Sequence, residues 1–385
     1  MPLAACPTPP MGWNSWNAFR TKIDEQQLVQ MADLIVSTGL RDAGYEYLVI
    51  DDGWQAPRRT ADGYLTSDPV RFGQGMAWLA DQIHQRGLKL GMYLTPGRAT
   101  CAMIYDAYPG EGLGSFGHER DDLDTYTSWG VDYLKYDWCE ACRDDTGLSY
   151  RQAFEHMGGL IAESPRTYVY SISEYGRTNP WEWAPGVANL WRTTPDIEPS
   201  FRSVSWLAES QRGLEQFSRP GAWNDPDMLQ AGNPGLSMPE CRSHVGLWAL
   251  LAAPLMAGND VRTMTRAVAD LLINPRMVAI NQDPLGQQGR RIHREFRFDV
   301  WARPLSGGRL AVGVLGQGES FSEPTRPLDI TLRDGLLRVD NGTENVLDLT
   351  GLLGTDYGRV TEVWSGEERD TAQIGARDLA LFTIG

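Results

Sequence analysis

The sequence predicts an α/β fold, a (β/α)8 TIM barrel followed by a C-terminal antiparallel β-sandwich domain. Three observations support this prediction. Eight short apolar runs alternate with helix-like segments over the first 290 residues, which is the pattern of parallel βα units. That span is close to the roughly 250 residues of a closed barrel. Beyond it, the helical pattern gives way to short alternating runs.

The eight apolar runs each predict one barrel strand. They are MGWNSW (11–16), EYLVID (46–51), LKLGMYL (88–94), VDYLKYD (131–137), TYVYSIS (167–173), NLWRTT (189–194), GAWNDP (221–226) and APLMAGN (253–259). Residues 24–40 and 75–87 carry apolar side chains at three- and four-residue spacing and end near a glycine. Both segments are therefore predicted to be amphipathic helices between strands.

The character of the chain changes after INQDPLGQQG (280–289). Runs such as FDVWARPLSGGRLAVGVLGQG alternate in short stretches separated by Gly, Asn and Asp, without helix signals. This pattern is typical of antiparallel strands. We predict a catalytic barrel over residues 1–290 and a β-sandwich domain over residues 291–385.

The composition favours a globular protein that acts on an uncharged molecule. The 385 residues are 42% hydrophobic and 22% charged, and their formal net charge is −15. Nucleic acids and anionic membranes repel a chain of this sign, so we expect neither as a partner. The 14 Trp and 14 Tyr residues exceed what a core requires, and tryptophan faces suit the C–H faces of sugars.

The N-terminal stretch MPLAACPTPP has neither the basic region nor the apolar region of a signal peptide, so none is predicted. A mature form that starts after such a peptide would look the same, so the sequence leaves the compartment open. It also leaves the oligomeric state open. The five cysteines are too widely spaced for a disulfide scaffold. A single bridge from Cys101 to Cys139 or Cys142 is compatible with their places just beyond strand ends.

The run LKYDWC (134–139) carries the strongest chemical signal. Side chains in a strand alternate between faces, so Lys135 and Asp137 point the same way, into the barrel and its open mouth. Such a pair costs several kcal/mol of desolvation unless it is used or well satisfied. It is either a buried structural ion pair or a carboxylate held ionised to act as a nucleophile.

Candidate site residues close the first seven predicted strands, at the end of the barrel where active sites lie. The set is Trp16, Asp51, Asp52, Tyr93, Lys135, Asp137, Glu174, Arg192, Asp196, Asp225 and Asp227. Crowded carboxylates cannot all ionise, so we expect at least one raised pKa. One ionised and one protonated carboxyl group is what cleavage of a glycosidic bond requires.

A metal site is the main alternative for a ring of carboxylates. Lys135 and Arg192 stand against it, because cations compete with a metal for the same oxygens. Zinc is disfavoured further by only five histidines, none in a ligand-spaced pair. We therefore expect neither a metal nor another cofactor.

The chain resembles a known family in eight ordered motifs at matching spacing. They are MGWNSWNAF, YLVIDDGWQ, RFGQGMAWLA, GLKLGMY, WGVDYLKYDWC, WRTTPDIE, WNDPDML and INQDPLGQQG. The family is glycoside hydrolase family 27, the α-galactosidase or melibiase family, and the resemblance covers about residues 8–290. It implies a retaining exo-glycosidase with a (β/α)8 domain and a C-terminal antiparallel β domain.

The resemblance also implies roles for individual residues. The nucleophile would be Asp137 and the acid/base Asp196, with their carboxyl groups about 5–5.5 Å apart. Asp51 and Asp52 would bind the 6-OH and 4-OH of galactose, Lys135 other hydroxyls, and Arg192 the 2-OH region. Trp16 and Tyr93 would line the sugar pocket. Asp225 and Asp227 are expected to hold the seventh loop through backbone hydrogen bonds, with Asp227 also reaching the pocket.

Substrate preference depends on the position after the fifth strand. SISEYGRTNPWEW aligns without a gap onto the plant-type pattern S-L-C-E-W-G, which would put Glu174 on the 2-OH and favour galactose over N-acetylgalactosamine. A one-residue slip would put Ser173 there. The segment 101–119 is longer than the usual third loop, and Thr95, Pro96 and Arg177 depart from the family pattern.

These departures keep several alternatives open. The family also contains β-L-arabinopyranosidases, isomaltodextranases and α-N-acetylgalactosaminidases. A catalytically silent sugar-binding protein on the same fold is a further alternative, against which the presence of both Asp137 and Asp196 counts. The expected partner is in every case a small carbohydrate, with a terminal galactoside favoured.

Overall fold

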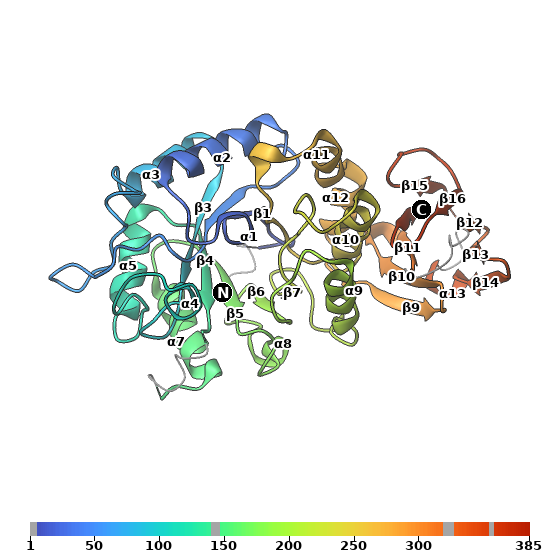
Figure 1. The fold of residues 1–385 in the computed structure, drawn as a ribbon. Helices are drawn as coiled ribbons and strands as arrows, with labels where there is room; N and C mark the ends of the chain where they lie inside the picture. Colours follow the sequence, from blue (N-terminus) through green and yellow to red (C-terminus); the bar gives the residue numbers. More distant parts are fainter. Residues whose placement is uncertain (1–5, 140–146, 319–326, 354–357) are drawn as a thin grey trace.

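The computed structural model describes residues 6–139, 147–318, 327–353 and 358–385. A barrel of parallel strands surrounded by helices forms the first part. Two antiparallel sheets form the second part, beside helices α10 (Met238–Leu250) and α12 (Pro275–Asn281) of the barrel (Figure 1). The predicted fold class is thereby confirmed.

The barrel sheet has the strand order β7-β6-β5-β4-β3-β2-β1-β8, with all neighbouring strands parallel. Its strands are β1 (Met11–Asn14), β2 (Tyr47–Ile50), β3 (Lys89–Leu94), β4 (Tyr133–Asp137), β5 (Val169–Ser173), β6 (Leu190–Arg192), β7 (Trp223–Asp225) and β8 (Leu255–Ala257). A parallel bridge between Leu229 and Ala257 joins the segment after β7 to β8 and closes the sheet. Each strand lies within one of the eight predicted runs.

The helices form where apolar residues recur on one face. In α2 (Glu25–Ser37), the side chain of Asp24 caps the N-terminus by accepting a hydrogen bond from the amide of Gln27 at 2.8 Å. The same helix buries Leu28, Met31, Ala32 and Ile35 against the barrel. This helix and α3 (Met76–Gln85) confirm the two helix predictions. The other barrel helices are α1 (Trp16–Phe19), α4 (Cys101–Tyr105), α5 (Glu119–Trp129), α7 (Tyr150–Glu163), α8 (Pro180–Trp183), α9 (Phe201–Ser210), α11 (Arg266–Leu272) and the 3₁₀ turn η2 (Val261–Thr263).

The C-terminal part consists of two sheets that share an apolar core. One sheet has the order β15-β17-β11-β10-β9 and the other β14-β13-β12-β16. Their strands are β9 (Arg290–Arg294), β10 (Phe298–Pro304), β11 (Leu310–Gly316), β12 (Leu328–Arg333), β13 (Leu336–Asp340), β14 (Glu344–Asp348), β15 (Val360–Glu362), β16 (Thr371–Ile374) and β17 (Leu379–Ile384), with the short helix α13 (Thr350–Leu353) and the turn η3 (Ser306–Gly308). Val300, Val312, Ile330, Val339 and Phe382 meet between the sheets.

The two parts are joined through a buried polar contact and a close helix approach. Arg303 of β10 is fully buried and donates hydrogen bonds to the carbonyls of Ala249 and Gln287, at 2.6 and 2.9 Å. On α10, a Cβ at Gly246 would lie 2.2 Å from the side chain of Leu379. Only glycine permits this approach of helix to strand. Among the described residues, no helix has the length and apolar character needed to cross a membrane.

Candidate active site

Nine of the ten residues predicted to act in catalysis or sugar binding line one cavity at the carboxyl ends of the barrel strands. The cavity measures about 380 Å³, and the nine are Trp16, Asp51, Asp52, Tyr93, Lys135, Asp137, Arg192, Asp196 and Asp227. Parallel strands deliver their ends to one face of a barrel, so residues far apart in the sequence converge there. The nine residues come from the ends of six strands, β1 to β4, β6 and β7, and from the loops that follow them.

Lys135 and Asp137 lie side by side on β4, as strand alternation predicts. The ammonium of Lys135 lies 2.7 Å from Oδ2 of Asp51 and 3.8 Å from Oδ2 of Asp137. Burial opposes its charge, but Asp51 and then Asp137 raise the pKa of Lys135 above its ordinary value. This cation therefore stays charged between two carboxylates and links the ends of β2 and β4.

Asp137 is buried at the floor of the cavity. Its Oδ1 accepts a hydrogen bond from the hydroxyl of Tyr175 at 2.7 Å. Burial raises the pKa of Asp137 to about 7, against the opposing influence of Lys135 and of the Tyr175 hydrogen bond. The group is thus poised near neutrality, with one oxygen held by a hydroxyl and the other turned toward a cation.

The two aspartates after β2 are held by backbone and side-chain donors. Oδ2 of Asp51 also accepts from Asn14 at 2.8 Å, and Asp52 accepts from the amides of Gly53 and Ala102, at 2.7 and 2.6 Å. Burial raises the pKa of Asp52 to about 6. Both carboxylates are fixed in position before any ligand arrives, which reduces the entropy lost on binding.

Arg192 of β6 bridges the two carboxylates on the far side of the cavity. Its guanidinium contacts Oδ1 of Asp196 and Oδ1 of Asp227, each at 3.1 Å. The side chain of Asp196 is 70% exposed at the mouth, whereas that of Asp227 is buried. Desolvation raises the pKa of Asp196, but the positive charges of Arg192 and then Lys135 outweigh it and hold this pKa below its usual range.

Asp225 and Asp227 shape the loop after β7. Oδ1 of Asp225 accepts a hydrogen bond from the amide of Asp227 at 2.8 Å, the expected Asx-type bond. Asp227 has a left-handed backbone, with φ at +89°, and its Oδ2 accepts from the amide of Ile197 at 2.8 Å. This strain turns Asp227 into the cavity and anchors the loop that carries Asp196.

The structure does not bring Glu174 into the cavity, which differs from the prediction. Glu174 is fully buried behind the wall, where its Oε2 accepts from the amide and the hydroxyl of Thr178, each at 2.9 Å. Tyr175 lines the cavity instead. Ser171 and Ser173 of β5 face the barrel interior. If the alternation of side chains along β5 is continued two residues past Ser173, it selects Tyr175. The sequence therefore contained a signal for this residue.

Sequence reasoning also missed the rim of the cavity. Arg20 places its guanidinium 4.3 Å from the ring centre of Trp16 and forms an ion pair with Asp106. Tyr105, which is 60% exposed, stands beside this pair. Arg20 follows α1, Tyr105 ends α4 and Asp106 follows it, in the connections after β1 and β3. No periodic pattern places a loop side chain, so only the unusual length of the third loop hinted at them.

The cations already occupy the gaps that a metal would need. Lys135 lies between Asp51 and Asp137, and Arg192 lies between Asp196 and Asp227. Within the described ranges, no three His, Cys, Asp or Glu side chains are grouped so that they could hold a metal ion. Lys135 and Arg192 thus supply positive charge to these four carboxylates.

A disulfide closes one wall of the cavity. Cys101 and Cys139 are bonded, with Cα atoms 5.2 Å apart, which confirms one of the two predicted pairings. The alternative partner, Cys142, lies outside the described residues. The hydroxyl of Tyr93 accepts from the amide of Cys101 at 3.2 Å and lies 3.2 Å from Sγ of Cys139. The bond thus fixes the start of α4 over the end of β4.

Loss of this disulfide should destabilise the fold. We expect the double variant Cys101→Ala, Cys139→Ala to lose about 4 kcal/mol of unfolding free energy, because the bond closes a loop with a sequence separation of 38. Guanidinium denaturation followed by tryptophan fluorescence measures this loss. Cys241→Ala, which removes a buried free thiol, is the matched control. A double variant as stable as that control would contradict the prediction.

The chain matches known proteins over most of its length. A family model described as Alpha galactosidase A matches residues 8–283, and one described as Alpha galactosidase A C-terminal beta sandwich domain matches residues 286–329. Alpha-galactosidase 2 of Arabidopsis thaliana is 41% identical over 318 residues, covering 83% of this chain and 78% of the relative. Alpha-galactosidase A of Homo sapiens is 39% identical over 332 residues, covering 81% and 75%. The crystal structure of alpha-galactosidase I from Mortierella vinacea superposes with a TM-score of 0.84 at 28% identity, covering 98% of this chain and 97% of that one. The chain belongs to the α-galactosidase family, glycoside hydrolase family 27.

Proposed function

We propose that this protein is a retaining exo-acting glycoside hydrolase that releases terminal α-linked D-galactose. The observation that carries this proposal is that two carboxyl groups, those of Asp137 at the end of β4 and Asp196 in the loop after β6, line one cavity. A glycosidase needs one carboxylate and one carboxylic acid beside the bond that it cleaves. Burial raises the pKa of Asp137, whereas Arg192, against desolvation, lowers that of Asp196, so the one proton of the pair rests mainly on Asp137. The reactive form is the one that carries this proton on Asp196. The similarity to enzymes named alpha-galactosidase supplies the sugar.

The reaction is a double displacement. In the first step Asp137 attacks the anomeric carbon from the β face while Asp196 gives a proton to the departing glycosidic oxygen. The product is a β-linked galactosyl ester on Asp137 and a free aglycone alcohol. In the second step Asp196 takes a proton from water, which attacks the anomeric carbon, frees Asp137 and releases α-galactose.

The remaining cavity residues fit a galactose ring that enters as a terminal unit. The fixed carboxylates of Asp51 and Asp52 accept from the 4-OH and 6-OH, while Lys135 donates to an adjacent hydroxyl. A sugar that lacks or misplaces these hydroxyls leaves buried charges without partners, a large penalty. Trp16 closes one side of the ring with its indole.

An assay with four chromogenic or oligomeric substrates tests the function. We expect turnover of p-nitrophenyl α-galactoside to exceed that of the N-acetylgalactosaminide, the β-L-arabinopyranoside and an isomaltose oligomer. Proton NMR of the first-formed sugar should show α-galactose before mutarotation. If another of the four substrates were preferred, its sugar would replace galactose in the proposal. If β-galactose were the first product, a retaining mechanism would be excluded. If none of the four substrates were turned over, a sugar-binding protein would be favoured.

The pH dependence follows from the proton shared by the carboxyl pair. Turnover needs one proton on the pair, and that proton leaves as the pH passes the pKa of about 7 that burial gives Asp137. We expect kcat/KM to fall about tenfold per pH unit above this value. In Tyr175→Phe this limb should move to higher pH, because the lost hydrogen bond favours the ionised form of Asp137.

Tyr105→Phe is the matched control for this shift, since Tyr105 lines the same cavity but is exposed at the rim. Its basic limb should coincide with that of the unaltered protein. The measurement is kcat/KM for p-nitrophenyl α-galactoside between pH 4 and pH 9. An unchanged limb in Tyr175→Phe would show that the Tyr175 hydroxyl does not tune the nucleophile.

A further inference from the structure

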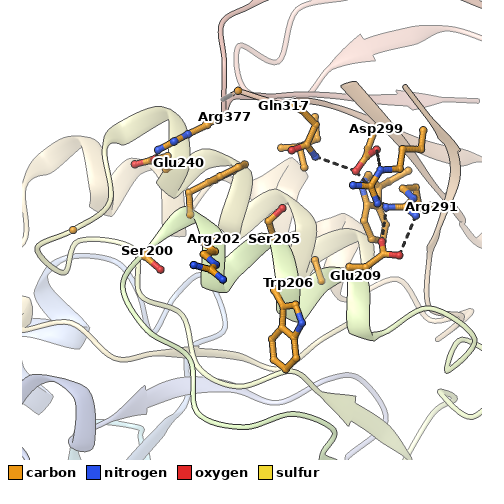
Figure 2. A pocket seen from close by; sticks show the side chains of 17 residues that line it. Ser200, Arg202, Ser205, Trp206, Glu209, Glu240, Arg291, Asp299, Gln317 and Arg377 are labelled. Atoms are coloured by element: carbon orange, nitrogen blue, oxygen red, sulfur yellow. Dashed lines mark hydrogen bonds and ion pairs between the residues drawn. The ribbon is translucent and has the colours of Figure 1, made fainter. Parts of the chain in front are cut away.

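A second cavity, of about 890 Å³, lies between the barrel and the β-sandwich, and we call it the interdomain groove. Helix α9 forms one wall, and strands β9 and β10 with the end of β11 form the other (Figure 2). The residues used below are Arg202, Ser205, Trp206 and Glu209 on α9, with Asp299 and Gln317 opposite. The groove lies outside the catalytic cavity and shares no lining residue with it.

The wall formed by α9 presents an aromatic side chain to solvent. Arg202, Ser205, Trp206 and Glu209 follow the spacing i, i+3, i+4, i+7, which places them on one face of the helix. Trp206 is 55% exposed and is the one exposed tryptophan in the part of the chain that the structure describes. An exposed indole forgoes the large free-energy gain that its burial would give. A helix face with an exposed indole therefore suits a ligand with apolar C–H groups.

Hydrogen-bonding groups of both charges surround this indole. Among the residues drawn in Figure 2, no hydrogen bond or ion pair joins Arg202 or Ser205 to another, so both side chains are available to a ligand in the groove. Across the groove, Asp299 accepts from Gln317 at 3.0 Å, and Arg291 binds Glu209 at 3.0 Å (Figure 2). The opposite wall is therefore held in place before binding.

The groove and the catalytic cavity are lined by neighbouring residues at the start of α9. Glu198 lines the cavity and Ser200 lines the groove, and the amide of Ser200 donates to the carbonyl of Glu198 at 2.7 Å. Two residues span at most about 7 Å, roughly one sugar unit. One chain molecule can therefore contact both sites at once.

We propose that the interdomain groove binds the uncharged main chain of a polysaccharide whose α-galactosyl branches enter the catalytic cavity. This inference rests on the proposed function. The indole of Trp206 stacks on the C–H face of a main-chain sugar, while Arg202 and Ser205 bond its hydroxyls. Most charges in the groove are paired with one another, because Arg291 binds Glu209 and Asp299, and Arg377 binds Glu240. A charged ligand would compete with these ion pairs, whereas an uncharged ligand with many hydroxyls leaves them intact.

Native gel electrophoresis in soluble guar galactomannan tests the groove. All proteins carry Asp137→Asn so that the polymer is not consumed. We expect the parent to be retarded and Trp206→Ala to bind about tenfold more weakly, the effect of one lost aromatic contact. Trp206→Phe should keep part of the retardation. Tyr64→Ala, which removes another exposed aromatic side chain that lines neither cavity, should behave as the parent.

The same substitution in the active protein gives an independent measurement. Trp206→Ala should lower kcat/KM on galactomannan about tenfold and leave kcat/KM on p-nitrophenyl α-galactoside within twofold. The inference would be overturned if Trp206→Ala lowered kcat/KM equally on both substrates, or if the parent and the variant were retarded equally. It would also be overturned if sedimentation showed a dimer that Trp206→Ala dissociates. An unaltered protein that cannot hydrolyse the small galactoside refutes the proposed function instead, whatever the retardation shows.

Discussion

Asp137→Ala is expected to abolish hydrolysis of α-galactosides, with kcat lower by about 10⁵-fold or more. The substitution removes the atom that bonds to the anomeric carbon, and no neighbouring group can replace it. Azide fits the vacated space and attacks from the same face. With p-nitrophenyl α-galactoside, added azide should therefore restore release of nitrophenol and give β-galactosyl azide, identified by NMR.

The stability of this variant separates a nucleophile from a structural ion pair. Breaking a buried pair that holds the fold together costs about 3–5 kcal/mol. Lys135 keeps its 2.7 Å contact with Asp51 when Asp137 is lost. The folded state also raises the pKa of Asp137 from 3.8 to about 7, so this carboxyl lowers stability as the pH rises through that interval.

Asp137→Asn should accordingly unfold at the same or a higher denaturant concentration than the unaltered protein at pH 7.5. The comparison uses urea denaturation, with Asp137→Asn as the nearly isosteric partner of Asp137→Ala. A loss of several kcal/mol in both variants, together with residual turnover, would identify Asp137 as a structural residue.

Asp196→Ala should slow hydrolysis in a way that depends on the leaving group. General acid catalysis contributes about 10²–10⁴-fold, and only where the departing oxygen needs a proton. We expect kcat/KM for a disaccharide such as melibiose to fall by about 10³-fold or more. A dinitrophenyl galactoside, whose phenolate departs unprotonated, should lose far less. Azide should yield α-galactosyl azide, since it now attacks the galactosyl ester on Asp137 in place of activated water.

Asp227→Asn is the matched control for this prediction. Asp227 contacts Arg192 at the same 3.1 Å as Asp196 does, but it is buried and anchors the loop that carries Asp196. Loss of the Asp227 carboxylate should lower kcat/KM for melibiose and for the dinitrophenyl galactoside by the same factor. If Asp196→Ala also affected both substrates equally, or if its azide product were the β anomer, Asp196 would not be the acid/base.

Much of the barrel was predictable because its determinants are local. The strands are short apolar runs with polar ends, and α2 and α3 repeat apolar residues with helical spacing. Lys135 and Asp137 were placed by alternation alone, since both lie inside β4. The assignment of roles to Asp137 and Asp196 remains a prediction, as does their carboxyl separation of about 5–5.5 Å.

The differences arise where the chain leaves regular structure. Glu174 follows the last residue of β5, and Tyr175 has a left-handed backbone with φ at +64°. Aligning motifs by residue type favoured the carboxylate, whereas the direction of the side chain favoured the tyrosine. The rim residues lie on loops, whose course depends on tertiary contacts that a single sequence does not encode in any periodic way.

The ion pair between Arg20 and Asp106 at the mouth contrasts with the buried pair of Lys135 and Asp51 on the floor. The Arg20 side chain is 53% exposed, and exposed pairs contribute at most about 1 kcal/mol. Substitution there is therefore tolerated, whereas a change on the floor leaves a buried charge alone. Directed evolution for new leaving groups should therefore accumulate its first substitutions at the mouth of the cavity, while the residues on the floor that bind the sugar ring stay unchanged.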